Sequence, residues 1–464
     1  MTTDVSIGPA DHSLKRTIGL YGAVSLALGI VVGAGMLSLP GLVYAHSGGW
    51  GVYAWLLDAA LVLPLLFVFA VLGRRFPSAG GVAGFVGQAF PILKPGCAFL
   101  LVGTFSLGLP GIAVTGAGYV VAGLDLIDPA FGNWVVTGVA AGIVGVVLIM
   151  GWVGAKFAGA VQNVVVTLLV LALGLVAASS VSHWPSIDFG AGDPTWPKLW
   201  SGMALAFFAY TGWEMLAFTA EEFKNPRRDF PVAVALSFAI VLALYVGAAL
   251  AVQALVALDD PRLGAAPLMV VVAATLTSGA AGQVLAVVVL GIILANLNGA
   301  VWAASRLLFD IGRSGWAPAW LSLGRLDGPA STPRSAVLAL GVLLAAVLYM
   351  FGAGWFELAD LLRIAGQNFF LLYTLCIIAY IKVETGMAAR TFGAIALAVC
   401  IAFSGVFGWG LAYAAGLFVL PYLFRGSTRC LAGALARVRS REDKPLLATM
   451  RSGRIADQRE KEAF

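Results

Sequence analysis

The chain has 464 residues, of which 60% are hydrophobic and only 11% are charged, and its formal net charge is +5. Soluble globular chains carry about 25% charged residues. The depletion of charge, with a mean hydropathy of +0.95, excludes an ordinary soluble domain and predicts an all-α integral membrane protein. Residues 1–16 are polar and contain no apolar leader, so we expect them to form a cytoplasmic N-terminal segment of the mature chain.

Twelve apolar stretches are long enough to cross about 30 Å of hydrocarbon as helices. In chain order they cover residues 17–45, 52–72, 95–124, 134–152, 157–181, 199–218, 232–258, 283–309, 336–351, 358–381, 391–403 and 407–424. Only residues 404–406 separate the last two stretches. The sequence therefore predicts twelve transmembrane helices.

The distribution of basic residues supports this count. If the N-terminus lies in the cytoplasm, the predicted cytoplasmic segments contain all of the 28 Lys and Arg residues except Lys198, Arg262 and Arg363. This is the bias that the positive-inside rule describes, and a missed or an extra helix would destroy it. We expect a multi-pass protein with both termini in the cytoplasm.

The C-terminal tail is basic, with ten Lys and Arg residues against five acids from residue 425 onward. Such a segment is typical of a solvated cytoplasmic end that rests near anionic membrane lipid. No aromatic residue stands between its charges, which argues against a nucleic acid partner because aromatic stacking usually accompanies such binding.

The first predicted helix contains Gly33-Ala34-Gly35 near its middle. Glycine is a poor helix former, and a helix interrupted here would expose the N–H groups that begin its second half. These groups carry the positive end of a half-helix dipole, which suits an anion such as a carboxylate. The alternative is that the glycines let two helices pack closely.

The sixth predicted helix contains Thr211-Gly212-Trp213-Glu214, again a glycine among polar groups in the middle of a helix. Two interrupted helices at corresponding positions of two halves indicate a transporter binding site. The first and sixth helices open two sets of five, as two inverted five-helix repeats require.

Two acidic residues fall within predicted helices, Asp58 and Glu214. Ionisable groups in hydrocarbon are rare and are functional hypotheses by default. We expect Glu214 to gate the site or carry protons, or else to bond the freed backbone; we expect Asp58 to move protons or to pair with a neighbouring helix. Amides in helices eight and ten either tie helices together or line a path; they are Asn296, Asn298, Gln367 and Asn368.

Residues 73–90 are too apolar for an ordinary loop and too rich in glycine for a stable transmembrane helix, so we expect them to lie at the inner membrane face or to dip into it. The three histidines lie at helix ends or in tails, and no HExxH motif occurs. The sequence therefore predicts no enzyme activity, no metal site and no cofactor, and it gives no indication of an oligomeric state.

Three segments resemble the amino acid–polyamine–organocation (APC) superfamily of transporters: residues 33–41, the inner loop 76–90 and residues 221–231. The inner loop and residues 214–231 are most similar to those of bacterial exporters of methionine and branched-chain amino acids. The resemblance covers residues 17–425 and implies a LeuT-like fold in the bacterial inner (plasma) membrane. Its parts would be a first inverted repeat at 17–182, a second at 199–382, two extra helices at 390–425 and the basic tail at 426–464.

The resemblance also implies a site for an amino acid. The carboxylate would meet the N–H groups of residues 34–36, and the ammonium group would meet the carbonyls of residues 30, 208 and 211. Phe208 stands where relatives carry an aromatic gate, and Glu214 where several carry a gating acid. The implied binding residues are Ile30, Gly33, Ala34, Gly35, Met36, Phe207, Phe208, Thr211, Gly212, Asn296 and Ala300.

One position departs from the superfamily. Some relatives carry a lysine, in place of a sodium ion, seven residues after the glutamine of a Val-Gln pair. Here Val161-Gln162 is followed at that position by Leu169. We therefore expect coupling to come from elsewhere, with protons acting through Glu214 or Asp58, although Asp58 has no match in the exporters.

Together these features predict a secondary active transporter of neutral amino acids, an exporter of methionine or branched-chain amino acids that works by alternating access and is linked to protons. The apolar residues around the predicted site favour these side chains over arginine or polyamines. An importer or exchanger of the same superfamily is the alternative, and an intramembrane enzyme or a channel or sensor subunit is a more distant one. The expected partners are the amino acid, membrane lipid and protons.

Overall fold

The computed structural model describes residues 18–76, 81–124, 126, 133–153, 159–190, 196–213, 216, 223–276, 280–327, 332–407 and 410–423. Within these ranges the chain forms helices, short 3-10 turns and two isolated β-bridges. The apolar composition explains this, because in hydrocarbon a helix satisfies every backbone polar group within its own segment.

The α-helices, in chain order, are α1 (Leu20–Val31), α2 (Ala34–Leu37), α3 (Leu39–Ser47), α4 (Gly51–Arg75), α5 (Gly81–Ala89), α6 (Lys94–Gly123), α7 (Trp134–Val153), α8 (Gly159–Ser179), α9 (Trp196–Ala209), α11 (Pro226–Leu255), α12 (Pro267–Thr275), α13 (Ala281–Arg313), α14 (Arg334–Gly352), α15 (Leu358–Val383) and α16 (Met387–Ser404). The 3-10 turns are η1 (Gly48–Trp50), η2 (Pro91–Leu93), η4 (Val181–Ser186), η6 (Ala319–Leu321) and η7 (Gly405–Phe407). A further helix covers Gly410–Leu423.

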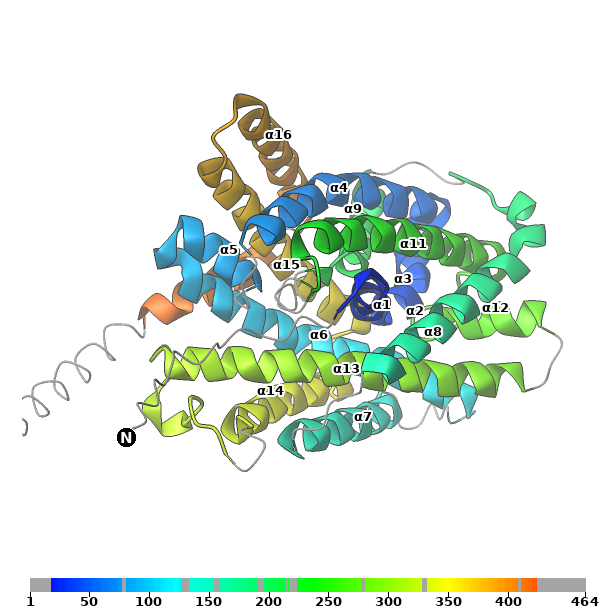
Figure 1. Cartoon of the computed structure of the whole chain (residues 1–464). Coiled ribbons are helices and arrows are strands. Elements are labelled where there is room, and N and C mark those ends of the chain that lie inside the picture. The colour runs from blue at the N-terminus through cyan, green and yellow to red at the C-terminus, as the bar shows by residue number, and fades with distance from the viewer. Residues whose placement is uncertain are drawn as a thin grey trace, which may run out of the picture.

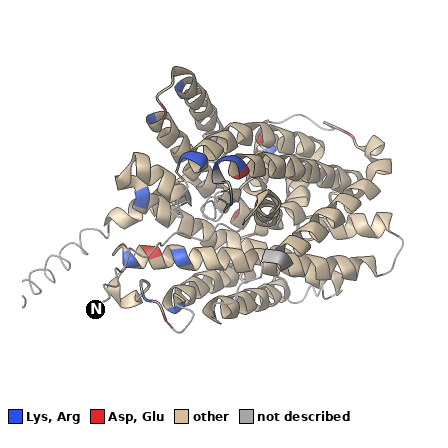
Figure 2. Ribbon diagram, in the orientation of Figure 1, with Lys and Arg blue, Asp and Glu red and all other residues tan. Residues whose placement is uncertain are grey.

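Long helices lie side by side, and the short α1, α2 and α3 lie among them (Figure 1). The most extensive helix pairs are α6 with α13, α15 and α7, and α11 with α4. Charged residues are sparse, and most of them lie near helix ends and in connecting segments (Figure 2). This arrangement leaves long uncharged stretches of helix, as a membrane-spanning bundle requires.

Among the residues that the structure describes, eight helical stretches are long and apolar enough to cross a membrane: Leu39–Arg75, Pro91–Gly123, Trp134–Val153, Arg227–Leu255, Ala281–Arg313, Arg334–Gly352, Leu358–Val383 and Met387–Ser404. Three shorter apolar helices are Leu20–Val31, Asn163–Ser179 and Gly410–Leu423. The prediction of an all-helical membrane protein is confirmed. The count of twelve crossings and the inverted pairing of the two halves stay predictions.

The inner segment 73–90 is more regular than its glycines suggest. Helix α4 continues to Arg75, and α5 covers Gly81–Ala89. Val82, Phe85 and Val86 are fully or almost fully buried, because residues spaced by three and four share one face of a helix. Helix α5 packs against α15 and α6, and the Phe85 ring lies 5.3 Å from that of Phe69 in α4, so burial offsets the poor helix propensity of the glycines.

A cluster of three aromatic rings marks the centre of the core. Trp55 of α4, Tyr210 after α9 and Tyr245 of α11 are all fully buried. Their ring centroids lie 5.1 Å apart for Trp55–Tyr245, 5.4 Å for Tyr210–Tyr245 and 5.8 Å for Trp55–Tyr210. The cluster therefore joins three helices that are remote in the sequence.

The segment before α1 pairs with the segment before α11. Ile18 and Phe223 form an isolated parallel β-bridge, and the Lys224 N–H donates to the Ile18 carbonyl at 2.8 Å. Phe223 is fully buried. The start of α1 is thus held by the backbone of a distant segment.

Candidate functional site

The first predicted helix is interrupted where its glycines indicated. Helix α1 ends at Val31, and Val32 and Gly33 are not helical. Helix α2 begins at Ala34, so the N–H groups of Ala34 and Gly35 lie in a first turn, where an α-helix provides no internal partner. The prediction of a break in this helix is confirmed.

The sixth predicted helix is interrupted as well. Helix α9 ends at Ala209, and residues 210–212 are not helical. Gly212 has a φ of +123°, a conformation that residues with a Cβ atom rarely adopt. Thr211 closes the end of α9, because its N–H and its hydroxyl both donate to the Phe208 carbonyl, at 3.1 and 2.7 Å. Glu214, the predicted gating acid, lies outside the described residues.

The two breaks touch each other. A Cβ atom added to Gly35 would lie 2.8 Å from the Cα of Ala209, at the end of α9. A Cβ atom added to Gly212 would lie 3.1 Å from a methyl group of Val31, at the end of α1. Each glycine therefore allows the close approach of the other interrupted helix. The two alternatives for the glycines of the first helix, a break and close helix packing, are both found at Gly35.

Side chains from two neighbouring helices satisfy the carbonyl groups that the first break exposes. The Tyr245 hydroxyl of α11 lies 2.9 Å from the Val31 carbonyl and 2.8 Å from the Ala209 carbonyl. A hydroxyl has a single proton, so the two carbonyls share it, and Tyr245 joins both breaks.

The second of these helices is α13. The side-chain amide of its Asn296 donates to the Gly29 and Ile30 carbonyls in the last turn of α1, at 3.1 and 3.2 Å. A Cβ atom on Gly33 would lie 3.1 Å from the same amide nitrogen. Asn296 was predicted to belong to the site, whereas Tyr245 was missed. The only sequence feature that marks Tyr245 is its polar hydroxyl in the middle of the apolar helix α11.

Most of the other predicted residues surround the two breaks. Met36 is fully buried, and its N–H donates to the Gly33 carbonyl at 3.2 Å. Phe208 is 9% exposed and packs against the backbone position of Gly366 in α15. Ala300 is half-buried, one turn after Asn296 on α13.

The Phe207 side chain, which was also predicted to bind the substrate, does not lie with these residues. Its ring instead lies in an aromatic cluster between α15 and the end of α16, formed with Phe370, Tyr373, Phe403 and Phe407. Consecutive residues of a helix point about 100° apart, so Phe207 and Phe208 cannot face the same side of α9.

Asp58 lies inside the protein, one turn after Trp55 on α4. Its side chain has no exposure, and neither carboxyl oxygen has a hydrogen-bond partner among the described residues. It lies within electrostatic reach of the Tyr210 phenol, whose hydroxyl donates to the Trp55 carbonyl at 3.0 Å. Tyr210 is itself the first residue of the second break, so the Asp58 carboxyl lies within electrostatic reach of that break.

The other amides serve as links between helices or stay buried. The Asn298 side chain donates to the sulfur of Met150 in α7, at 3.8 Å. The Gln367 side chain donates to the Phe407 carbonyl at 3.2 Å. Asn368 is fully buried, and its amide has no hydrogen-bond partner among the described residues. Leu169, at the lysine position of some relatives, is 2% exposed in α8.

The sequence profile of the amino acid permease family matches residues 18–428, which includes both breaks and every helix described above. The chain belongs to this family. It is an amino acid transporter and not an enzyme, and it is a multi-pass membrane protein.

Two bacterial relatives match over almost their whole lengths. The chain is 27% identical over 424 residues to the uncharacterized amino acid permease YecA of Bacillus subtilis, covering 89% of this chain and 96% of that one. It is 28% identical over 422 residues to the L-methionine/branched-chain amino acid exporter YjeH of Escherichia coli, covering 88% and 96%. The serine/threonine exchanger SteT of Bacillus subtilis is 25% identical over 333 residues, covering 70% and 75%.

A solved structure shares the fold. The crystal structure of MhsT in complex with L-phenylalanine superposes with a TM-score of 0.62 at 15% sequence identity, and the match covers 85% of this chain and all of that one. At this identity the likeness shows the fold alone.

The contact between Gly35 and Ala209 yields a first prediction. Gly35→Ala places a methyl group 2.9 Å from the Ala209 side chain, and overpacking of this kind costs about 1–3 kcal/mol. We expect a lower melting temperature and a loss of amino acid transport in proteoliposomes. Gly138→Ala is the matched control, because a Cβ atom there meets nothing within 4 Å. Equal behaviour of the two variants would show that the breaks do not touch.

The bridge made by Tyr245 yields a second prediction. Tyr245→Phe removes the proton that the Val31 and Ala209 carbonyls share. The Val31 carbonyl keeps the Gly33 N–H at 3.0 Å, so the Ala209 carbonyl is the group most affected, and the loss of a donor to a buried acceptor costs about 1–3 kcal/mol. We expect this variant to melt at a lower temperature and to transport more slowly. The control is Tyr349→Phe, whose side chain is 61% exposed. If Tyr245→Phe matches this control in both measurements, the hydroxyl does not hold the breaks together.

Proposed function

We propose that this protein is a secondary active transporter that carries methionine or branched-chain amino acids out of the cell by alternating access, across the bacterial inner membrane and with both termini in the cytoplasm. The observation that carries the proposal is the contact between two interrupted helices, because interrupted helices at the centre of a membrane fold offer backbone dipoles to a small zwitterion. The amino acid would bind between them.

The chemistry of the backbone suits an amino acid. The N–H groups of Ala34 and Gly35 begin α2 and would bind the carboxylate, with that of Met36 once its long bond to the Gly33 carbonyl opens. The Ile30 carbonyl accepts one bond from Asn296 and keeps a second lone pair for the ammonium group. The Phe208 carbonyl already accepts two bonds from Thr211, so an ammonium group would have to share it.

The surroundings favour a neutral side chain. Among the described residues at the breaks, the side chains that face the other helix are apolar, aromatic or amide groups, and none of them is charged. An arginine or polyamine would leave a second cation without a partner in a low-dielectric site. The exporter YjeH, named for methionine and branched-chain amino acids, is one of the two full-length relatives described above.

We propose that protons drive the transport through Asp58. An ionised carboxylate without hydrogen bonds is strongly disfavoured inside a membrane protein, so the buried position of Asp58 favours the neutral acid. The titratable group within electrostatic reach of Asp58 is the phenol of Tyr210, whose ring lies 5.4 Å from that of Tyr245. Tyr245 in turn bonds the carbonyls at both breaks. Loss of the Asp58 proton would therefore change the electrostatic field at the phenols beside the proposed binding site. Glu214, two residues after the second break, is the further candidate for this role.

An exchanger is the second candidate function, because SteT is named as one and matches 70% of this chain. Exchange and export use the same site and differ only in whether the empty carrier can return across the membrane. The two are separated by the requirement for an amino acid on the opposite side.

Transport by purified protein in proteoliposomes tests the substrate proposal. We expect saturable flux of labelled methionine that is inhibited by leucine, isoleucine and valine and is unaffected by arginine or putrescine. Flux into empty vesicles indicates export or import, and flux only into vesicles preloaded with amino acid indicates exchange. Inhibition by arginine equal to that by leucine would contradict a neutral site, and flux that never saturates would contradict a carrier.

The substitution Asp58→Asn tests the coupling proposal. Asn is nearly isosteric with the neutral acid but cannot release a proton, so we expect exchange between loaded vesicles to persist while the response to an imposed proton gradient disappears. The control is Asp310→Asn at the exposed end of α13, where the side chain is 34% exposed, and we expect it to keep the response. An unchanged response in Asp58→Asn would assign coupling to another group.

A further inference from the structure

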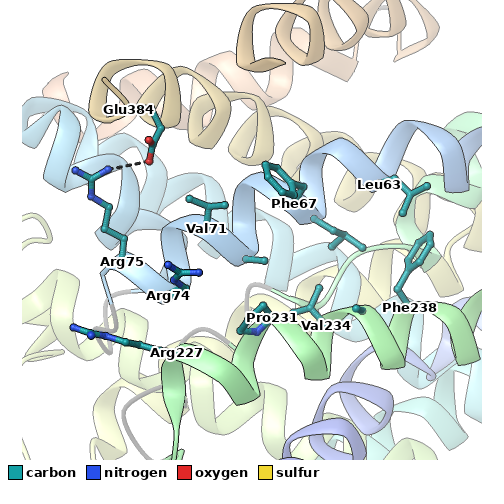
Figure 3. A pocket seen from close by; sticks show the side chains of 13 residues that line it. Leu63, Phe67, Val71, Arg74, Arg75, Arg227, Pro231, Val234, Phe238 and Glu384 are labelled. Atoms are coloured by element: carbon teal, nitrogen blue, oxygen red, sulfur yellow. Dashed lines mark hydrogen bonds and ion pairs between the residues drawn. The ribbon is translucent and has the colours of Figure 1, made fainter. Parts of the chain in front are cut away.

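A groove lies between α4 and α11 (Figure 3). It encloses about 820 Å³. Apolar side chains of α4 between Leu63 and Val71 form one wall, and side chains of α11 between Pro231 and Phe238 form the other. None of its lining residues belongs to either break. We call it the α4–α11 groove.

Basic residues gather at one end of this groove. Arg74 and Arg75 end α4, Arg227 begins α11, and Glu384 follows α15. Glu384 accepts an ion pair from Arg75 at 2.9 Å. Arg74 and Arg227 have no ion-pair partner among the residues that the structure describes. Two guanidinium groups are therefore left to receive an anion, and arginine binds phosphate through two parallel N–H donors.

The apolar part of the groove is open to the membrane. Leu63 and Phe67 are 52% and 51% exposed, although α4 lies in a stretch that can cross a membrane. The helix rises about 16 Å from Leu63 to Arg74 at 1.5 Å per residue. That length is close to half of the roughly 30 Å of hydrocarbon in a bilayer, so the groove matches one leaflet.

We propose that the α4–α11 groove binds an anionic phospholipid, whose phosphate contacts Arg74 and Arg227 and one of whose acyl chains lies against α4 and α11. A soluble anion would satisfy the arginines but leave the apolar walls uncovered. A zwitterionic lipid would bring a cation to a cluster that already holds three arginines against one glutamate. The tail from residue 425 is itself basic and does not complement this end.

A residue of the α11 wall, Phe238, connects the bound lipid with the proposed transport site. Phe238 lines the groove, and its ring centroid lies 6.3 Å from that of Tyr210 and 6.1 Å from that of Trp213. Tyr210 and Trp213 flank Gly212 at the second break. An acyl chain against Phe238 therefore supports the side chains that hold this break, which gives the bound lipid a way to influence transport.

Lipid-dependent melting of the purified, delipidated full-length protein tests the proposal without any measurement of transport. We titrate phosphatidylglycerol and phosphatidylcholine with the same acyl chains, and inorganic phosphate alone. We expect phosphatidylglycerol to raise the melting temperature at lower concentration than phosphatidylcholine, and inorganic phosphate to have no effect. Equal shifts from both lipids would mean unspecific solvation, and a shift from inorganic phosphate alone would mean a site for a soluble anion; either result overturns the proposal.

Two matched pairs of variants locate the effect. Arg227→Gln removes a groove arginine, and Arg228→Gln removes an exposed neighbour that does not line the groove. We expect only Arg227→Gln to weaken the response to phosphatidylglycerol, by about fivefold in concentration. Ala235→Trp fills the groove, whereas Leu236→Trp, at a 47% exposed position outside it, does not.

We expect Ala235→Trp to remove the preference for phosphatidylglycerol and Leu236→Trp to keep it. Melting in phosphatidylcholine alone shows that each variant is folded, so a lost preference cannot be mistaken for unfolding. An identical preference in both members of each pair would place the lipid elsewhere and overturn the proposal.

Discussion

The hydroxyl of Tyr245 joins the carbonyl ends of α1 and α9, and the arrangement of the two breaks depends on this bond. An interrupted helix in hydrocarbon exposes backbone groups that water cannot reach, and each such group must find a partner within the protein. Tyr245 gives partners to two carbonyls at once. The surrounding rings of Trp55 and Tyr210 fix its position, so an irregular backbone is held by a rigid aromatic support.

The need of each exposed backbone group for a partner also explains which residues surround the site. Carbonyl groups at the break are bonded by Tyr245 of α11 and Asn296 of α13, while the N–H groups of Ala34 and Gly35 lie in the first turn of α2, where the helix provides no partner. Two glycines make this possible, because Gly35 and Gly212 let each break approach the backbone of the other helix. The interrupted helices thus expose polar backbone groups, and side chains of the uninterrupted helices hold these groups in position.

Local sequence features predicted the breaks, because glycine lowers helix propensity wherever it stands and Gly212 needs a positive φ. Side-chain direction was harder to predict. Phe207 and Phe208 are neighbours and both contact α15, Phe207 through the Phe370 ring and Phe208 at Gly366, so the sequence alone does not show which ring joins the aromatic cluster. Tyr245 was missed because its partners lie 214 and 36 residues away, and nothing near it in the sequence indicates them. The α4–α11 groove was missed for the same reason, since two remote helices form it.

The backbone pairing of Ile18 with Phe223 has a practical consequence for work with this protein. That contact joins the entrance of α1 to the segment that leads from the second break into α11. A tag or fusion partner placed directly ahead of Ile18 therefore lies beside the main-chain bond that joins the start of α1 to the start of α11. A fluorescent or affinity label attached after the helix that covers Gly410–Leu423 is remote from this bond in the sequence, which makes that end of the chain the better position.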